Sequence, residues 1–394
     1  MLDLSKISLQ LMEMARARQK EIQQLKEKER CLLEAVSHFR ENRQAYMEKI
    51  DSDSHHFFVA FPKGRLDEAF PLPQPISSHT VIAVDGSQID VDTHEIVLCY
   101  VLNIGRVVLH YGTGDPPLMD SLPYLYYNDE DLYKREGPEV FLLRGEDVAE
   151  KRAEMEARHL KDLILNYRKE GIPAVALVDG TLVSWDKAAS AKKDIGGFTA
   201  PHFKDAFKAG QSLGIPVAGY ISGSRTSLVV NTLRAGDCAR PIMNCAVCEY
   251  RSDATAPCHR LEGLRDTALF ARILRPGERS TCFYGGINTL PRHEWPLYRI
   301  GFFYVNVGSE IARVEAPDYV LEDESLLNLL HWAVYDQAQK GMGYPIALQE
   351  AHHFAVVKGE EREAFYRLVE GQFVRRGLPS RVTNKELRKR TRIF

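Results

Sequence analysis

The chain has 394 residues and a net charge of −3, with 44% hydrophobic and 27% charged residues. This composition is typical of a globular protein with a large core, and it excludes general attraction to nucleic acid through a polycationic surface. No apolar run approaches the roughly 18 residues of a membrane span, and the charged N-terminal segment is unlike a secretory signal. Because the seven cysteines are also an odd number, we expect a protein of the reducing cytoplasm with no membrane partner.

The first 50 residues predict one long amphipathic helix, in which apolar residues recur every seven positions with an interruption at Arg18. We expect this helix to serve packing or dimerisation. The segment 51–79 contains four prolines and is expected to be a linker. The heptad residues are Leu4, Leu11, Leu25, Leu32 and Phe39.

Strand patterns begin at Val81. Three apolar segments separated by short polar or glycine breaks predict an antiparallel meander, and a helix from about Glu146 to Lys169 and a strand ending in Asp179 follow it. This is the element order of the ribonuclease H-like fold. We therefore expect an α/β protein with a ribonuclease H-like mixed sheet and flanking helices, plus the long N-terminal helix and a cysteine-bearing insertion. The remaining elements expected are helices near 201–213 and from Ser224 to Leu233, and a strand at 216–222.

Two of the predicted strands end alike, in Asp85-Gly86-Ser87 and in Asp179-Gly180-Thr181. An aspartate at a strand exit places a carboxylate where a cation can be held, and glycine allows a sharp turn. The first and fourth strands of a ribonuclease H-like sheet are neighbours, so Asp85 and Asp179 should lie side by side. The alternative is that Asp-Gly is only a turn signal.

A metal-dependent nuclease needs further carboxylates, because two-metal chemistry holds ions about 3.5–4 Å apart. The helix at 146–169 has four glutamates, and periodicity selects Glu156. It continues an apolar stripe with Leu160 and Leu163, whereas Glu154 shares its face with basic residues. A buried acid is costly unless it is paired or bound to a metal. The alternative is therefore a buried ion pair between Glu156 and Arg152.

A phosphatase that forms an aspartyl-phosphate is the nearest enzymatic rival, because LVDGTLV is similar to its DxDGT motif. That chemistry needs an aspartate two residues before the second acid. Leu177 stands there in one segment and Ala83 in the other, so the nucleophile is missing from both. The absence of a phosphate-binding P-loop and of a GxGxxG fingerprint disfavours a nucleotide-driven motor or a dehydrogenase.

The order VDGSQ, a glutamate-bearing helix, LVDGT, ISGSR and GYPIALQEAHH resembles the NurA nucleases over about residues 80–360. The resemblance implies a Mn²⁺-dependent deoxyribonuclease, with Mg²⁺ as a substitute, that has 5′-to-3′ exonuclease and single-strand endonuclease activity. It further implies action on single-stranded DNA and duplex ends during end resection and repair, as a homodimer with a HerA-type hexameric ATPase. Carried over by motif, it implies Asp85, Glu156 and Asp179 as catalytic metal ligands.

The family also uses a tyrosine and a histidine near the end of this domain. Tyr344 and His352 match that segment, and His353 leaves the histidine register open. A histidine can ligate a metal or move a proton to a leaving group. The alternative is a pair of histidines on a helix surface.

Two segments are candidates for DNA contact. Ser222, Ser224 and Arg225 leave a strand and enter the predicted helix, where hydroxyls and N–H groups can bind a phosphate; the alternative is an ordinary N-cap. The region 361–394 is expected to form a C-terminal helix and a tail, which from Arg375 carries eight basic residues and one acid. That excess suits the DNA backbone, although a solvated or partner-binding tail fits it too.

Four cysteines fall in the segment 236–262 with the spacing C-x6-C-x2-C-x9-C. The central CxxC is typical of structural zinc sites, and the two outer thiolates would complete a tetrahedron. An iron–sulfur cluster, unliganded thiols or a disulfide are the alternatives. The cluster lies outside the common core of NurA proteins, so the resemblance says nothing about it. The four are Cys238, Cys245, Cys248 and Cys258.

A non-catalytic function is the last alternative, namely an inactive ribonuclease H-like module that serves as a DNA-binding scaffold. Two strand-end acids, a helix glutamate and a histidine argue for the enzyme, because a scaffold has no need of them.

Overall fold

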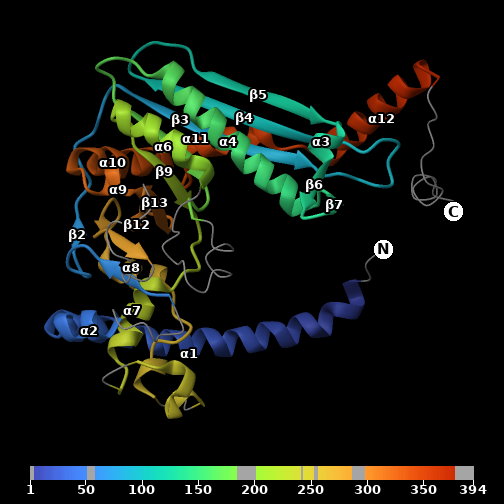
Figure 1. Ribbon diagram of the computed structural model, residues 1–394. Coiled ribbons are helices and arrows are strands. Elements are labelled where there is room, and N and C mark those ends of the chain that lie inside the picture. Colours follow the sequence, from blue (N-terminus) through green and yellow to red (C-terminus); the bar gives the residue numbers. More distant parts are fainter. Residues whose placement is uncertain are drawn as a thin grey trace. The chain divides into compact units, whose positions relative to one another are not determined.

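The computed structural model describes residues 4–50, 58–183, 201–240, 243–252, 256–285 and 298–377 (Figure 1). The chain forms two compact units. The first unit comprises residues 1–74, 180–200 and 219–335, and the second comprises 75–179, 201–218 and 336–394. These divisions differ from the expected boundaries at residues 50, 79 and 360. Within the described ranges, no helix has the length and apolar character that crossing a membrane requires.

The second unit contains the predicted meander. Strand β3 (His79–Ile89) pairs with β4 (Tyr100–Tyr111), and β4 pairs with β5 (Leu118–Tyr126), all antiparallel. Strand β8 (Ala174–Asp179) lies on the other side of β3 and runs parallel to it. Because helix α4 (Gly145–Tyr167) connects β5 to β8, the expected ribonuclease H-like order is confirmed.

Smaller elements complete the second unit. Helix α6 packs beside α4, and β6 and β7 form a hairpin of their own. The elements are α3 (Asp129–Leu132), β6 (Tyr133–Glu136), β7 (Glu139–Leu142), η2 (Pro201–Phe203), α6 (Lys204–Leu213), α11 (Ile346–Ala355) and α12 (Gly359–Arg375).

Helices α4 and α11 cover opposite faces of β3. Successive residues of a strand point to opposite faces, and Gly86 faces α4 while the hydroxyl of Ser87 donates to the carbonyl of Ala355 in α11. On the neighbouring strand, Asn103 donates to the same carbonyl at 2.7 Å. Ser87 and Asn103 thus satisfy carbonyl groups at the C-terminus of α11 that have no partner within the helix. Polar side chains of the sheet therefore fix this helix.

Gly105 of β4 allows α11 to lie directly on the sheet. A Cβ atom placed there would stand 2.2 Å from the carbonyl oxygen of Ala351 and 2.6 Å from the amide nitrogen of Ala355. These are backbone atoms and cannot turn away. We expect Gly105→Ala to lower the free energy of unfolding by about 1–3 kcal/mol, measured by denaturant titration. Gly371→Ala, in open space on α12, should be neutral or stabilising, and an unchanged stability of Gly105→Ala would contradict the packing.

The first unit has its own strands. β1 pairs with β11, β11 with β12, β12 with β13, and β13 with Gly219–Ile221 of β9, all antiparallel. A short strand, β10, joins β2 to β12. The strands are β1 (Ala60–Pro62), β2 (Ala69–Phe70), β9 (Val217–Ile221), β10 (Arg279–Ser280), β11 (Phe283–Gly285), β12 (Ile300–Asn306) and β13 (Ile311–Pro317).

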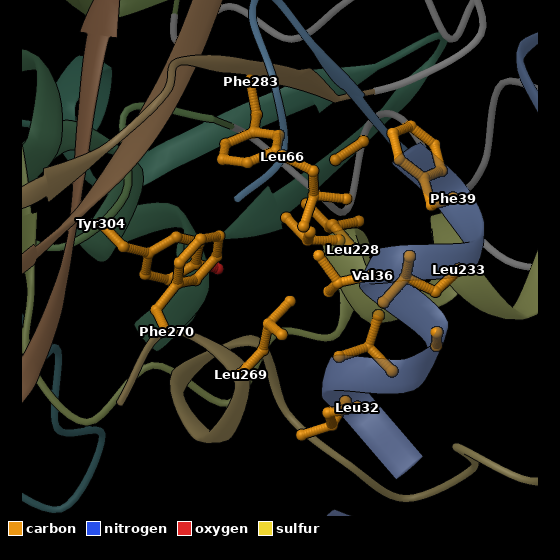
Figure 2. Packing of buried hydrophobic residues seen from close by; sticks show 14 of the residues in the cluster. Leu32, Val36, Phe39, Leu66, Leu228, Leu233, Leu269, Phe270, Phe283 and Tyr304 are labelled. Atoms are coloured by element: carbon orange, nitrogen blue, oxygen red, sulfur yellow. The ribbon is translucent and has the colours of Figure 1, made fainter. Parts of the chain in front are cut away.

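The core of the first unit joins helices to these strands (Figure 2). Phe39 and Leu32 from α1 pack with Leu233 from α7, and Phe270 from α8 stacks on Tyr304 from β12 at a centroid distance of 4.6 Å. The helices are η1 (Leu4–Ile7), α1 (Ser8–Glu41), α2 (Arg43–Ile50), α7 (Leu228–Gly236), α8 (Asp266–Ile273) and α9 (Asp318–Leu321), with α10 (Glu324–Lys340) divided between the units after Tyr335.

Three sequence-based expectations need correction here. The N-terminal helix is broken at Asn42 into α1 and α2. The expected linker 51–79 contains β1, buried beside β11, as well as β2. Helix α7 begins at Leu228, four residues after the expected Ser224, because 224–227 make loop hydrogen bonds instead. Most of the basic tail, from 378 onward, lies outside the described residues.

Candidate metal centre

Asp85 and Asp179 are neighbours, as predicted. In the parallel pairing of β3 with β8, Val84 lies opposite Val178, so the next residue of each strand is an aspartate. Paired residues of a parallel sheet point to the same face. The side chain of Asp85 is 19% exposed, and Asp179 lies exposed at the end of its strand. Two carboxylates of the second unit therefore stand side by side on neighbouring strands, at the C-terminal end of β8.

The two Asp-Gly pairs differ in backbone conformation. Gly180 has a φ of +94° and makes the turn expected after β8. Strand β3 instead continues through Gly86 to Ile89, so the expected turn there is wrong. Gly86 matters for its missing side chain, because a Cβ atom would stand 2.4 Å from Oε1 of Glu156 and 2.9 Å from Cγ of Arg152.

Glu156 reaches over Gly86 from α4. Its side chain is 19% exposed, and Nε of Arg152 lies 3.2 Å from its Oε1. The ion pair weighed as an alternative is therefore present in the structure. Glu154, by comparison, is 46% exposed and pairs with Lys151 on the outer side of the helix, as its charged surroundings predicted.

Burial raises the pKa of Glu156 to about 7, and the charges of Asp85 and Asp179 add to the rise while Arg152 opposes it. The guanidinium of Arg152 alone therefore does not offset the rise in the pKa of Glu156 that burial and the nearby carboxylates cause. A region with surplus negative charge and hard oxygen donors is suited to a divalent cation such as Mn²⁺ or Mg²⁺.

His352 completes the group from α11. Its Nδ1 lies 2.8 Å from Oδ2 of Asp85, while Oδ1 of the same carboxylate accepts the backbone N–H of Gly86 at 2.8 Å. The His352 side chain is 61% exposed, so its other ring nitrogen is accessible. His353 instead lies 3.7 Å from Glu350. The structure therefore brings His352, and not His353, to Asp85.

The candidate ligands are of the types that bind a divalent metal, but their side chains do not converge on one point. Among the residues that the structure describes, no three His, Cys, Asp or Glu side chains are close enough to hold an ion as they stand. Glu156 turns toward Arg152. Binding of an ion would therefore require this carboxylate to exchange its guanidinium partner for the metal.

The family model of the NurA domain matches residues 79–357. The chain belongs to the NurA family. The match covers all four candidate residues of the centre, from Asp85 to His352, and nearly the whole expected range 80–360. No curated protein matches the chain.

Solved structures of NurA proteins are similar to this family member over most of its length. The NurA nuclease from Sulfolobus solfataricus is 13% identical, covers 87% of this chain and 96% of its own, and gives a TM-score of 0.44. A NurA structure with manganese is 13% identical over 89% and 98%, with a TM-score of 0.39. The catalytic domain of human endonuclease V is 13% identical over 88% and 99%, with a TM-score of 0.32. Because these scores are low, the family assignment depends on the match of the NurA domain alone.

Tyr344, the other residue matched to a NurA motif, lies in the turn before α11 and is partly exposed. It belongs to the second unit, as the acids and His352 do. A catalytic role for Tyr344 stays a prediction.

The segment proposed to bind phosphate already has an acidic neighbour in this NurA chain. The hydroxyl of Ser222 and the N–H of Gly223 both donate to Oε2 of Glu310, at 2.9 and 2.8 Å. Ser224 is buried and hydrogen-bonds to Thr226, whereas Arg225 is exposed. A carboxylate among these donors disfavours a phosphate, so the geometry does not support this part of the prediction.

Sequence reasoning missed the residues that position this centre. Ser87 and Asn103 fix α11 by its terminal carbonyls, and Gly86 and Gly105 leave room for α4 and α11. Gly86 and Ser87 could have been found from the sequence, because they belong to the VDGSQ segment. Gly105 lies opposite Asp85 in the β3–β4 register, which no feature of the sequence indicates.

Proposed function

We propose that the protein is a metal-dependent nuclease that hydrolyses phosphodiester bonds in DNA. The observation that supports this best is the grouping of Asp85, Asp179 and His352 at the C-terminal end of β8, with Glu156 buried across Gly86. The family supports it as well, since one similar structure is described as a NurA nuclease and another as NurA with manganese.

The three carboxylates and His352 would hold the metal. A divalent ion bound there would activate water and stabilise the leaving oxygen of the phosphodiester. Asp85 fixes the ring of His352 through Nδ1, a hydrogen bond that sets which nitrogen is free and how the ring is oriented. The exposed nitrogen is then placed to bind a metal or to give a proton to the leaving group.

We propose further that the metal is Mn²⁺, with Mg²⁺ as a substitute, and that the activity is a 5′-to-3′ exonuclease and single-strand endonuclease activity in DNA repair. The proposed partner is a HerA-type ATPase, and the proposed location is the cytoplasm. Exposed apolar residues in η1 and the first half of α1 support a homodimer, because covering such residues is favourable. These are Leu4 in η1 and Leu9, Leu11, Met12, Met14 and Ile22 in α1.

Degradation of a single-stranded oligonucleotide tests the proposal. The purified chain should degrade the oligonucleotide with Mn²⁺ and stop when EDTA removes the metal. A duplex with blunt ends and a closed circular single strand, tested in parallel, separate exonuclease from endonuclease activity. Tight DNA binding without cleavage under any divalent metal would contradict the nuclease and favour the alternative, an inactive ribonuclease H-like scaffold.

The affinity for Mn²⁺ should depend on pH through Glu156. Because burial raises the pKa of this carboxyl to about 7, the metal-free protein increasingly carries a proton there as the pH falls below that value. The metal must displace this proton, so the dissociation constant should rise about tenfold per pH unit below 7. Calorimetric titration at pH 5.5–8 checks this, and Glu156→Gln should bind more weakly with a flatter profile. If the dissociation constant changed equally steeply with pH in the wild type and in Glu156→Gln, Glu156 would not be the group that the metal deprotonates.

A further inference from the structure

Four cysteines of the first unit surround one cavity. Cys238 follows α7, Cys245 and Cys248 lie in and after the short helix η3 (Cys245–Val247), and Cys258 lies in η5 (Pro257–His259). All four line a cavity of about 330 Å³ together with Arg234, Arg240 and His259. The fold thus brings to one cavity all four cysteines that the sequence spreads over a C-x6-C-x2-C-x9-C pattern.

The thiols are available as ligands. All seven cysteines of the chain are free, and these four are half-buried. By contrast, Cys99 and Cys282 are buried. Four thiols that line one cavity and are not joined in disulfides are free to bind a common cation as thiolates.

The surroundings of the cavity carry charge of both signs, because Arg234 and Arg240 line it and lie 3.4 and 3.5 Å from Glu262 and Glu249. Nε of Arg234 donates to the carbonyl of Cys258 at 2.9 Å, and Nζ of Lys49 donates to the carbonyl of Cys238 at 2.6 Å. These cations hold the backbone at two of the four cysteines. Four thiolates around a zinc ion or around a [4Fe–4S] core keep a net charge near −2, which neighbouring arginine and lysine side chains stabilise.

In the described residues around the four cysteines, the apolar core is small. The apolar cluster beside Cys238 contains Ile50, Val59, Phe61, Ala235 and Met243. Cys245 and Cys258 lie in the short 3₁₀ helices η3 and η5, and Cys248 lies between η3 and η4 (Glu249–Ser252). Segments of this kind, which bury little apolar surface, are commonly ordered by a metal whose binding energy becomes folding energy.

We propose that this cavity holds a metal centre with four thiolate ligands, Cys238, Cys245, Cys248 and Cys258. The thiols line a space and do not yet meet at one point, since the described residues contain no ready ligand triad. Either a zinc ion draws them inward or a larger iron–sulfur cluster fills the space between them. Both have the same thiolate chemistry, and neither depends on the nuclease proposed above.

The metal content of the full-length chain, purified without oxygen or chelator, tests the proposal. Elemental analysis should find either about one zinc per chain, or about four iron atoms with as much acid-labile sulfide and visible absorption. Cys245→Ser with Cys248→Ser should lose that metal. Cys31→Ser should keep it, because Cys31 is equally half-buried but lies in α1. Asp85→Ala should keep it too, which separates this centre from the nuclease site.

A cobalt titration of the wild-type chain tests the proposal without depending on whether the cysteine variants fold. The wild-type chain, stripped of metal under reducing conditions, should bind one Co²⁺ with thiolate-to-cobalt absorption in the near ultraviolet, and zinc should abolish that absorption. A folded wild-type protein that contains neither zinc nor iron and gives no such absorption would overturn the proposal. Metal retained in the double cysteine variant would overturn it as well.

Discussion

Asp85→Asn should reduce the cleavage of DNA by about 10²–10³-fold or more while leaving the fold intact. Asparagine has the same shape, and its amide oxygen can still accept the N–H of Gly86 that Oδ1 of Asp85 accepts at 2.8 Å. What it removes is the charge between Asp179 and His352. Preorganised charge of this kind commonly contributes two to three orders of magnitude to a rate. The measurement is the initial rate on a single-stranded oligonucleotide at saturating Mn²⁺.

The matched control is Asp90→Asn. Asp90 lies just beyond the end of β3, is exposed, and accepts a hydrogen bond from Gln88 at 2.6 Å. It undergoes the same chemical change five residues away and should keep full activity. Thermal unfolding of both variants shows whether either lost its structure. A folded Asp85→Asn protein with the wild-type rate would rule out this carboxylate as part of the centre.

The sequence predicted the parts of the site that depend on strand and helix periodicity. The pairing of Asp85 with Asp179 follows from strand order, which local hydrophobic patterns reveal. Glu156 was selected because its spacing from Leu160 and Leu163 put it on the buried side of α4, and both leucines are buried there. Short-range periodicity determines which face a residue occupies, so these inferences needed no tertiary information.

The sequence did not predict what depends on packing between distant elements. The Asp-Gly pairs look alike in the sequence, yet Gly180 turns the chain and Gly86 stays in an extended strand beneath Glu156. Local residue preferences cannot distinguish the two, because the difference lies in what packs on each glycine. Likewise, the sequence separation of 267 between Asp85 and His352 leaves the choice of histidine open until α11 is placed on the sheet.

Gly86→Ala should impair metal binding and catalysis without destabilising the protein. The added methyl would stand 2.4 Å from Oε1 of Glu156, the far end of a flexible side chain, and 2.9 Å from Cγ of Arg152, so both side chains would have to shift. Glycine inside a strand is itself unfavourable, so the alanine should be neutral or slightly stabilising for the fold. Displacing the carboxylate should weaken Mn²⁺ binding by about 10–100-fold, the usual effect of disturbing a group that orients a metal site. Calorimetry measures the affinity, and thermal unfolding measures the stability.

A double-mutant cycle tests whether Gly86 acts through Glu156. If the methyl group harms the site only by displacing this carboxylate, Gly86→Ala should cost nothing further in a Glu156→Gln background, and the two effects should be strongly non-additive. Additive losses would mean that the alanine disturbs Asp85 or the backbone of β3 instead. A Gly86→Ala protein with wild-type affinity and rate would show that Glu156 lies elsewhere when the metal is bound. The missing side chain at Gly86 would then serve only the packing of α4 against the sheet.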